Sequence, residues 1–156
     1  MKVARLTISD RASAGIYEDK SGPEIERVFR EAWEEPCDII ARIVPDDRES
    51  ISRTLASLAD QQRCDLILTT GGTGPAARDV TPEATREVLE KELPGFGETQ
   101  RALSFRSVPT AILSRATAGV RGRSLIINLP GNPKAIAECL PPVVPAIREA
   151  LRHLAE

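Results

Sequence analysis

The stretch Asp65-Leu66-Ile67-Leu68-Thr69-Thr70-Gly71-Gly72-Thr73-Gly74-Pro75 decides the fold. Its apolar first half is typical of a buried β-strand, and three glycines follow within four residues. Glycine lets backbone N–H groups approach a ligand closely. A strong helix start, Thr81-Pro82, comes soon afterwards and would add further donors and a positive dipole end. This combination predicts an anion site, above all one for phosphate.

The glycine segment is neither a P-loop nor a dinucleotide-binding fingerprint. It lacks the Gly-Lys-Ser/Thr ending of the first and the G-x-G-x-x-G spacing of the second. A tight turn that needs positive φ is the structural alternative. Its place directly after a buried-type strand favours ligand contact, because α/β sheets bind ligands beyond the carboxyl ends of their strands. The residues expected to line the site are Gly71, Gly72, Thr73 and Gly74.

Asp79 is the second notable feature of this region. A phosphate repels a nearby carboxylate unless a metal ion or a proton lies between them, so Asp79 indicates Mg²⁺ and phosphate-transfer chemistry. The alternative is a turn or cap residue. Thr81 is the better candidate for the helix N-cap, with Pro82 at the first helical position, which leaves Asp79 without an evident structural role.

Strand-like and helix-like segments alternate along the chain, which predicts an α/β fold. We expect one domain over residues 1–156, with three layers and a mostly parallel sheet flanked by helices. The predicted strands are Val3–Ile8, Asp38–Val44, Asp65–Thr70, Thr110–Leu113 and Leu125–Leu129. The predicted helices are Pro23–Glu35, Arg48–Gln62, one from Thr81, Phe96–Ser107, and one from Asn132 that Pro141, Pro142 and Pro145 could kink or split. Gly122 suggests a hairpin turn into the last strand.

Four loops follow strands and should therefore meet at one edge of the sheet. They are Ser9–Gly22, Pro45–Asp47, Gly71–Asp79 and Pro130–Pro133. The first is long for a connection between a strand and a helix, which favours a functional role over a merely solvated loop. Its end, Ser21-x-x-Glu24, has the pattern of a capping box, and so does Asp46-x-x-Glu49 in the second loop.

The fourth loop supplies Gly131 and then Asn132 as a helix N-cap. It is either a second anion site, with Lys134 nearby, or simply a well-capped helix. Ser114 and Arg115, and the pair Arg121 and Arg123, could bind phosphate, although solvation is favoured for the arginines.

Composition excludes several classes of function. A net charge of -2 gives no general basic footprint for nucleic acid. No apolar run approaches the length of a membrane span, and the start of the chain does not have the pattern of a signal peptide. Three scattered cysteines favour reduced thiols and a cytoplasmic location. The single histidine, His153, argues against a catalytic triad and against a histidine-rich metal site.

Taken together, these segments resemble the molybdopterin adenylyltransferases of molybdenum-cofactor biosynthesis, over about Val3 to Leu151. The main signature is Leu68–Pro75 with Arg78–Thr85. The Gly-Gly-Thr-Gly segment is also present in molybdenum-insertase and competence-damage-type domains, whereas the first loop narrows the match to the adenylyltransferases. The other matching segments are Ser9–Gly15, Asp19–Gly22, Val44–Asp46, Glu92–Glu98, Leu113–Ala116 and Leu125–Pro133.

The resemblance implies transfer of AMP from ATP to the terminal phosphate of molybdopterin, with release of pyrophosphate and with Mg²⁺ as cofactor. By position, Asp79 and Asp46 match catalytic aspartates, and we assign both to metal or nucleotide-phosphate handling. Ser9, Asp10, Gly71–Gly74, Ser114, Gly131 and Asn132 match residues that line the pocket. The resemblance also implies a homotrimer that works with other proteins of molybdenum-cofactor biosynthesis.

Two other functions remain open at this point. One is a related enzyme of the same fold that acts on another nucleotide, and the other is a non-catalytic protein that binds or scaffolds the pterin. The presence of both Asp46 and Asp79 argues weakly against the second.

Overall fold

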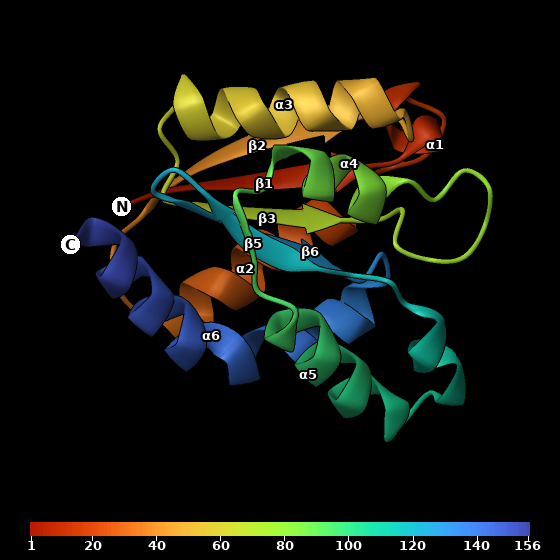
Figure 1. Ribbon diagram of the computed structural model, residues 1–156. Helices are drawn as coiled ribbons and strands as arrows, with labels where there is room; N and C mark the ends of the chain where they lie inside the picture. Colours follow the sequence, from red (N-terminus) through yellow and green to blue (C-terminus); the bar gives the residue numbers. More distant parts are fainter.

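The structure is a computed structural model that describes all of residues 1–156. One sheet lies between two layers of helices (Figure 1). Its strands are β1 (Lys2–Ile8), β2 (Asp38–Val44), β3 (Leu66–Thr70), β4 (Lys91–Glu92), β5 (Ala118–Arg121) and β6 (Ser124–Leu129). The helices are α1 (Asp10–Ser13), α2 (Ser21–Trp33), α3 (Arg48–Asp60), α4 (Thr81–Val88), α5 (Gly95–Phe105), the 3₁₀ helix η1 (Pro109–Leu113) and α6 (Pro133–Ala155).

The sheet has the order β2-β1-β3-β6-β5-β4. The first four strands in that order run parallel, and β5 and β4 add an antiparallel edge. Ile8 is paired with Val44, and Thr70 with Leu129, so the carboxyl ends of the parallel strands lie together. The predicted α/β fold with a mostly parallel sheet is confirmed.

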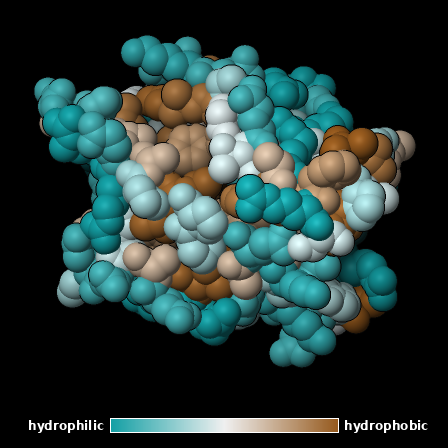
Figure 2. Space-filling view, turned by 90° about the horizontal axis from the view of Figure 1, so that it is seen from below, coloured by the Kyte–Doolittle hydropathy of each residue, from teal (hydrophilic) through white to brown (hydrophobic).

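Two apolar layers hold the helices against the sheet. Leu66 and Leu68 of β3 belong to the layer under α2, α5 and α6, whereas Ile67 belongs to the layer under α3 and α4. This division follows from the alternation of side chains along a strand. The outer surface of the helical face seen from below is largely hydrophilic, with separate hydrophobic patches (Figure 2). None of the helices combines the length and the apolar character needed to cross a bilayer.

The predicted strand Thr110–Leu113 is wrong, because this segment lies within η1. Ile112 and Leu113 are exposed and do not pair with a strand. Two short strands, β4 and β5, were not predicted as strands, since they are only two and four residues long. The predicted hairpin at Gly122 is confirmed: β5 and β6 pair antiparallel around this residue, which has a φ of 56°.

Helix α6 is continuous through its three prolines. Its buried side chains pack on α2 and on the sheet across the whole proline region, and this tertiary packing stabilises the helix where backbone hydrogen bonds are missing. These side chains are Ile136, Cys139, Leu140, Val143, Val144 and Ile147.

Candidate active site

The four strand-end loops meet at the carboxyl edge of the parallel strands, on the right in Figure 1. Loop 9–20 follows β1, loop 45–47 follows β2, loop 71–80 follows β3, and loop 130–132 follows β6. A Cβ atom placed on Gly131 would lie 3.5 Å from Cα of Gly71, so the third and fourth loops are in contact.

The glycine segment combines positive φ with close backbone packing. Gly71 and Gly72 have φ values of 97° and 67°, which L side chains rarely adopt. A Cβ atom on Gly71 would overlap the carbonyl oxygen of Ile8. The N–H groups of Gly72, Thr73 and Gly74 donate no hydrogen bond to the rest of the chain. The segment therefore presents three consecutive unused donors, which is the property expected of an anion-binding loop.

Thr81 does not cap α4 as predicted. It is the first residue of the helix, and no side chain caps the preceding Val80. The Thr81 hydroxyl instead donates to the carbonyl oxygen of Gly71 at 2.9 Å, and its N–H donates to that of Gly72 at 3.1 Å. Thr81 thus fixes the glycine segment to the start of α4.

Arg115 also holds loop 71–80 in place through hydrogen bonds. Its Nε donates to the carbonyl oxygen of Gly74 at 2.9 Å, and its Nη2 to that of Asp79 at 2.8 Å. It also pairs with Glu83, and this hydrogen bond lowers the pKa of the Glu83 carboxyl. The interpretation of Arg115 as a solvated side chain is wrong, because three groups of loop 71–80 and α4 engage it.

Asp79 has a structural contact that the sequence did not reveal. One carboxylate oxygen, Oδ2, accepts the N–H of Ala76 at 3.1 Å. A Cβ atom placed on Gly74 would lie 2.8 Å from the same oxygen, so the carboxylate lies against the glycine segment. Its other oxygen, Oδ1, accepts no hydrogen bond within the chain and is available to a ligand.

Asp46 is held by a reciprocal pair of hydrogen bonds with Asp10. The Asp10 N–H donates to Oδ2 of Asp46 at 3.0 Å, and the Asp46 N–H donates to Oδ1 of Asp10 at 2.9 Å. Asp47, rather than Asp46, caps α3 by accepting the N–H of Ser50. Asp46 is therefore free of the capping role that its spacing from Glu49 suggested.

The pKa values of Asp46 and Asp10 are shifted in opposite directions. Burial raises the pKa of Asp46, and the negative charges of Asp10 and Asp79 raise it further. The hydrogen bond from Arg78 lowers the pKa of Asp10. Arg78 thus forms an ion pair with Asp10 but not with Asp46, whose pKa its charge lowers only in small part.

Ser9 and Asn132 both act as helix caps. The Ser9 hydroxyl accepts the N–H of Ala12 at the start of α1, and the Asn132 side chain accepts the N–H of Lys134 at the start of α6. The cap predicted at Asn132 is therefore confirmed. The long loop that was expected after β1 contains the short helix α1.

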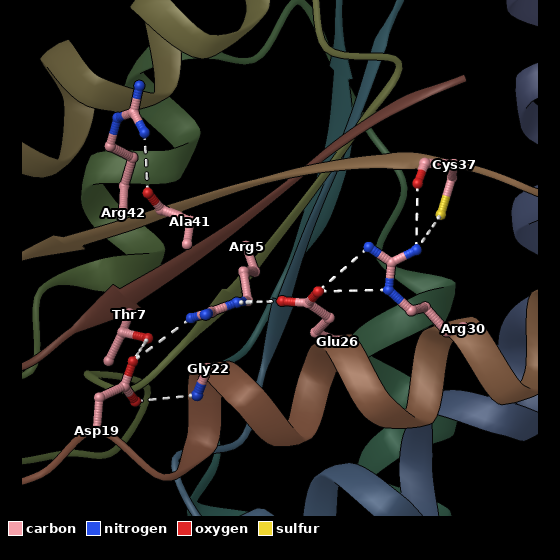
Figure 3. A network of polar contacts seen from close by, with 9 residues as sticks. All are labelled: Arg5, Thr7, Asp19, Gly22, Glu26, Arg30, Cys37, Ala41 and Arg42. Carbon is pink, nitrogen blue, oxygen red and sulfur yellow. Dashed lines mark hydrogen bonds and ion pairs between the residues drawn. The ribbon is translucent and has the colours of Figure 1, made fainter.

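Figure 3 shows how the end of that loop is tied to β1. Asp19 accepts the Thr7 hydroxyl at 2.7 Å and the Gly22 N–H at 2.9 Å, and it lies 3.7 Å from Nη1 of Arg5. Glu26 of α2 accepts from Arg5 at 3.1 Å. Asp19 therefore satisfies one N–H in the first turn of α2, whose N-cap position is Lys20, and the capping box predicted from Ser21 is wrong.

A cavity of about 260 Å³ lies between α5, η1, loop 130–132 and the start of α6. Of the residues predicted from the sequence, Ser114 and Asn132 line this cavity. Gln100, Ser104 and Glu138 also line it and were not predicted. Only Gln100 and Ser104 have a sequence signal, which is their spacing. They are four residues apart on α5, so they share a face of that helix.

The predicted site residues thus form two adjacent groups. Asp10, Asp46, the glycine segment and Asp79 surround the ends of β1, β2 and β3, whereas Ser114 and Asn132 belong to the cavity. Arg115 directly follows Ser114 and contacts the glycine segment, and Gly131 lies against Gly71, so the groups are contiguous. The chain brings together no cluster of three or more histidine, cysteine, aspartate or glutamate side chains suited to a metal ion.

Residues 4–149 match the family model described as a probable molybdopterin binding domain. The molybdopterin adenylyltransferase of Helicobacter pylori strain 26695 is 57% identical over 91% of this chain and 81% of that protein. The protein of the same name from Escherichia coli K12 is 47% identical over 98% of this chain and 78% of that protein. The crystal structure of the molybdopterin biosynthesis enzyme MoaB from Thermus thermophilus superposes with a TM-score of 0.89. It is 45% identical and covers 98% of this chain and 95% of that one.

Proposed function

Because the chain belongs to the family of molybdopterin-binding domains, we propose that it transfers AMP from ATP to the terminal phosphate of molybdopterin. Its relatives of 47% and 57% identity carry the name of this activity and match nearly the whole chain. The observation that carries the proposal is the placement of Asp46 against Gly72 and of Asp79 against Gly74, in a glycine segment with three unused N–H donors. The product would be adenylylated molybdopterin, and pyrophosphate would leave.

The reaction is an in-line displacement at the α-phosphorus of ATP. An oxygen of the terminal phosphate of molybdopterin forms the new P–O bond, and the bond to the β-phosphate breaks, so that pyrophosphate departs with the electron pair. The attacking phosphate is already ionised at neutral pH and needs no side-chain base. The task of the protein is to hold two anions close together and in line, and the donors of Gly72, Thr73 and Gly74 suit this task.

The two carboxylates fit a magnesium ion. Each has an oxygen without a partner in the chain, and Mg²⁺ commonly takes one or two carboxylates while phosphates and water complete its shell. We propose that Asp46 and Asp79 hold this ion, which would offset repulsion between the two substrates' phosphates when bound. Burial, and after it the negative charges of Asp10 and Asp79, raises the pKa of Asp46, and a bound cation would offset both effects.

We assign the pterin to the cavity beside the glycine segment. Asn132, Ser114 and Lys134 line it. The start of α6 and the Lys134 ammonium suit the terminal phosphate of molybdopterin, because both favour a negative charge. Ser9 and Asp10, at the end of β1, would adjoin the nucleotide.

The oligomer and the cellular setting belong to the same proposal. We propose a cytoplasmic homotrimer that exchanges molybdopterin with other proteins of cofactor biosynthesis. Large apolar side chains remain exposed on the single chain, and exposed apolar surface favours contact with another protein surface. They include Ile16, Tyr17, Val108, Ile112 and Leu113.

The experiment that tests the function combines purified protein, molybdopterin, ATP and Mg²⁺. We expect adenylylated molybdopterin and an equal amount of pyrophosphate, separated by chromatography and identified by mass. Binding of molybdopterin without product at stoichiometric enzyme would indicate a binding or scaffolding protein instead. Turnover of a different nucleotide-containing substrate would indicate a related enzyme of the same fold.

A further inference from the structure

Two residues that line the cavity each have a buried acceptor oxygen without a donor. These oxygens are Oε1 of Gln100 on α5 and Oε1 of Glu138 on α6, and both are buried from solvent. They are the only buried side-chain oxygen or nitrogen atoms in the chain without a hydrogen-bond partner. A buried acceptor without a partner costs free energy, so its presence indicates that a ligand or water supplies the donor.

The orientation of the Gln100 amide is fixed by its other contact. Its Nε2 donates to the carbonyl oxygen of Asn128 at 3.0 Å. Exchanging the amide nitrogen and oxygen would set two acceptors against each other, so Oε1 has to be the atom left without a donor. The residue is only 3% exposed, and its helix is held to α6 by contacts of Cys139 with Ser104 and with the Gln100 carbonyl.

Glu138 makes no ion pair with any residue of the chain, although Lys134 precedes it by one helical turn. A carboxylate accepts two parallel N–H donors from a flat ligand edge. Glu138 and Gln100 therefore offer acceptors from two helices that pack on each other. Such acceptors favour a ligand edge with N–H donors over one with carbonyl oxygens.

We propose that Glu138 and Gln100 determine specificity by accepting hydrogen bonds from the 2-amino-4-oxopyrimidine edge of a pterin. That edge carries an exocyclic amino group next to a ring N–H, which matches a carboxylate. This inference rests on the proposed function, because it names the part of molybdopterin that the cavity would bind. It adds two residues that act on the ring, away from the phosphates at which bonds change.

The first test is the KM for molybdopterin of Glu138→Gln. The amide keeps the shape of the side chain but presents a donor where an acceptor is needed. We expect the KM to rise about ten- to hundredfold while the KM for ATP stays unchanged, as for loss of a charge-assisted hydrogen bond. Glu149→Gln is the matched control, because Glu149 lies on the same helix, exposed and outside the cavity.

The second test uses two inhibitors that differ at one group. 6-Hydroxymethylpterin carries the 2-amino group, and 6-hydroxymethyllumazine carries an oxygen there. Wild type should be inhibited more strongly by the pterin, and Glu138→Gln should lose that preference, which a merely structural role of Glu138 would not cause. In Gln100→Leu we expect a similar rise in the KM for molybdopterin, with some loss of thermal stability because the Asn128 carbonyl loses its donor.

The outcomes separate the two proposals. Product formation by the wild type reports on the function, whereas the KM values and the inhibitor preference of the variants report on Glu138 and Gln100. A KM for molybdopterin in Glu138→Gln within twofold of wild type would overturn the inference, and so would a pterin preference that the variant retains. That result would mean that water alone satisfies the two oxygens.

Discussion

At the scale of the residue, Asp46 is the carboxyl whose surroundings are least favourable to its charge. Burial and the charges of Asp10 and Asp79 raise its pKa above the usual 3.8. A raised carboxyl pKa means that the folded protein binds the proton more tightly than the unfolded chain does. The ionised group therefore costs stability above its folded pKa, and that cost disappears as the pH falls.

From this we predict the effect of Asp46→Asn. The amide oxygen can still accept the Asp10 N–H, and the unfavourable charge is gone, so the melting temperature at pH 7 should equal or exceed that of wild type. Turnover should nevertheless fall by at least about a hundredfold, because the oxygen proposed for the metal becomes neutral. Calorimetry and the adenylylation assay measure the two effects. A less stable variant that keeps its activity would refute this account of Asp46.

The pH profile of wild type gives a separate prediction. Protonation of Asp46 removes the charge proposed to hold Mg²⁺, so kcat/KM should fall on the acid side with an apparent pKa above 3.8. Added Mg²⁺ should move this pKa downward, because the cation competes with the proton. An acid limb that does not respond to Mg²⁺ would show that another group titrates.

The roles of individual polar residues were the part of the site least accessible from sequence. Asp46 and Asp79 could be identified as candidates because each lies in a loop that follows a predicted strand. The hydrogen bonds of these carboxyls could not be predicted, because the partner of Asp46 is Asp10, 36 residues away in the sequence. Thr81 shows the same limit, since its spacing suggested a cap while its hydroxyl binds the carbonyl of Gly71.

At the scale of the element, loop 71–80 depends on Arg115 for its conformation. For Arg115→Met we predict a loss of about 1–3 kcal/mol in the free energy of unfolding, because carbonyl oxygens of the loop and Glu83 lose their partner. Turnover should also fall, since the donors of the glycine segment lose their fixed arrangement. Denaturant unfolding and steady-state kinetics measure the two effects.

Arg121→Met is the matched control for this prediction. Arg121 also joins elements, through Asp60 of α3 and the Val88 carbonyl, but it lies away from the glycine segment. It should lose comparable stability without losing activity at a temperature where the variant is folded. Equal loss of activity in both variants would mean that Arg115 acts only through general stability.

Elements with a strong apolar period were predictable, and short or irregular ones were not. The strand over residues 38–44 and the start of α3 at Arg48 agree with the sequence prediction, because the apolar, β-branched run of the first and the acidic cap of the second are local signals. In contrast, Thr110–Leu113 contains a β-branched and apolar run that is helical and exposed. Its conformation depends on its contacts with α5, which no local pattern encodes.

At the scale of the whole molecule, the parallel arrangement of β1, β2, β3 and β6 brings the functional loops to one edge. This gathering was predictable from the order of strands and helices. The cavity was not, because Gln100 and Glu138 come from helices whose packing on each other had to be known. The exposure of the large apolar side chains is likewise known only from the structure, because it depends on how the helices pack.

The proposed trimer is tested at this scale by light scattering after size exclusion. We predict a mass three times the 16.9 kDa of the chain, independent of loading concentration in the micromolar range. A species with the mass of one chain would contradict the trimer and would leave the exposed apolar surface for another partner. The adenylylation assay on the same fractions shows whether the oligomer is the active form.

The most direct test of the account is a single-turnover experiment with ATP labelled at the α-phosphate, at stoichiometric enzyme and saturating Mg²⁺. Wild type should move the label to molybdopterin, whereas Asp79→Asn should bind molybdopterin with unchanged affinity, retain its fold and transfer no label. The asparagine can still accept the Ala76 N–H, so loss of transfer would reflect the missing charge. Transfer by Asp79→Asn at the rate of wild type would contradict the proposed role of the paired carboxylates.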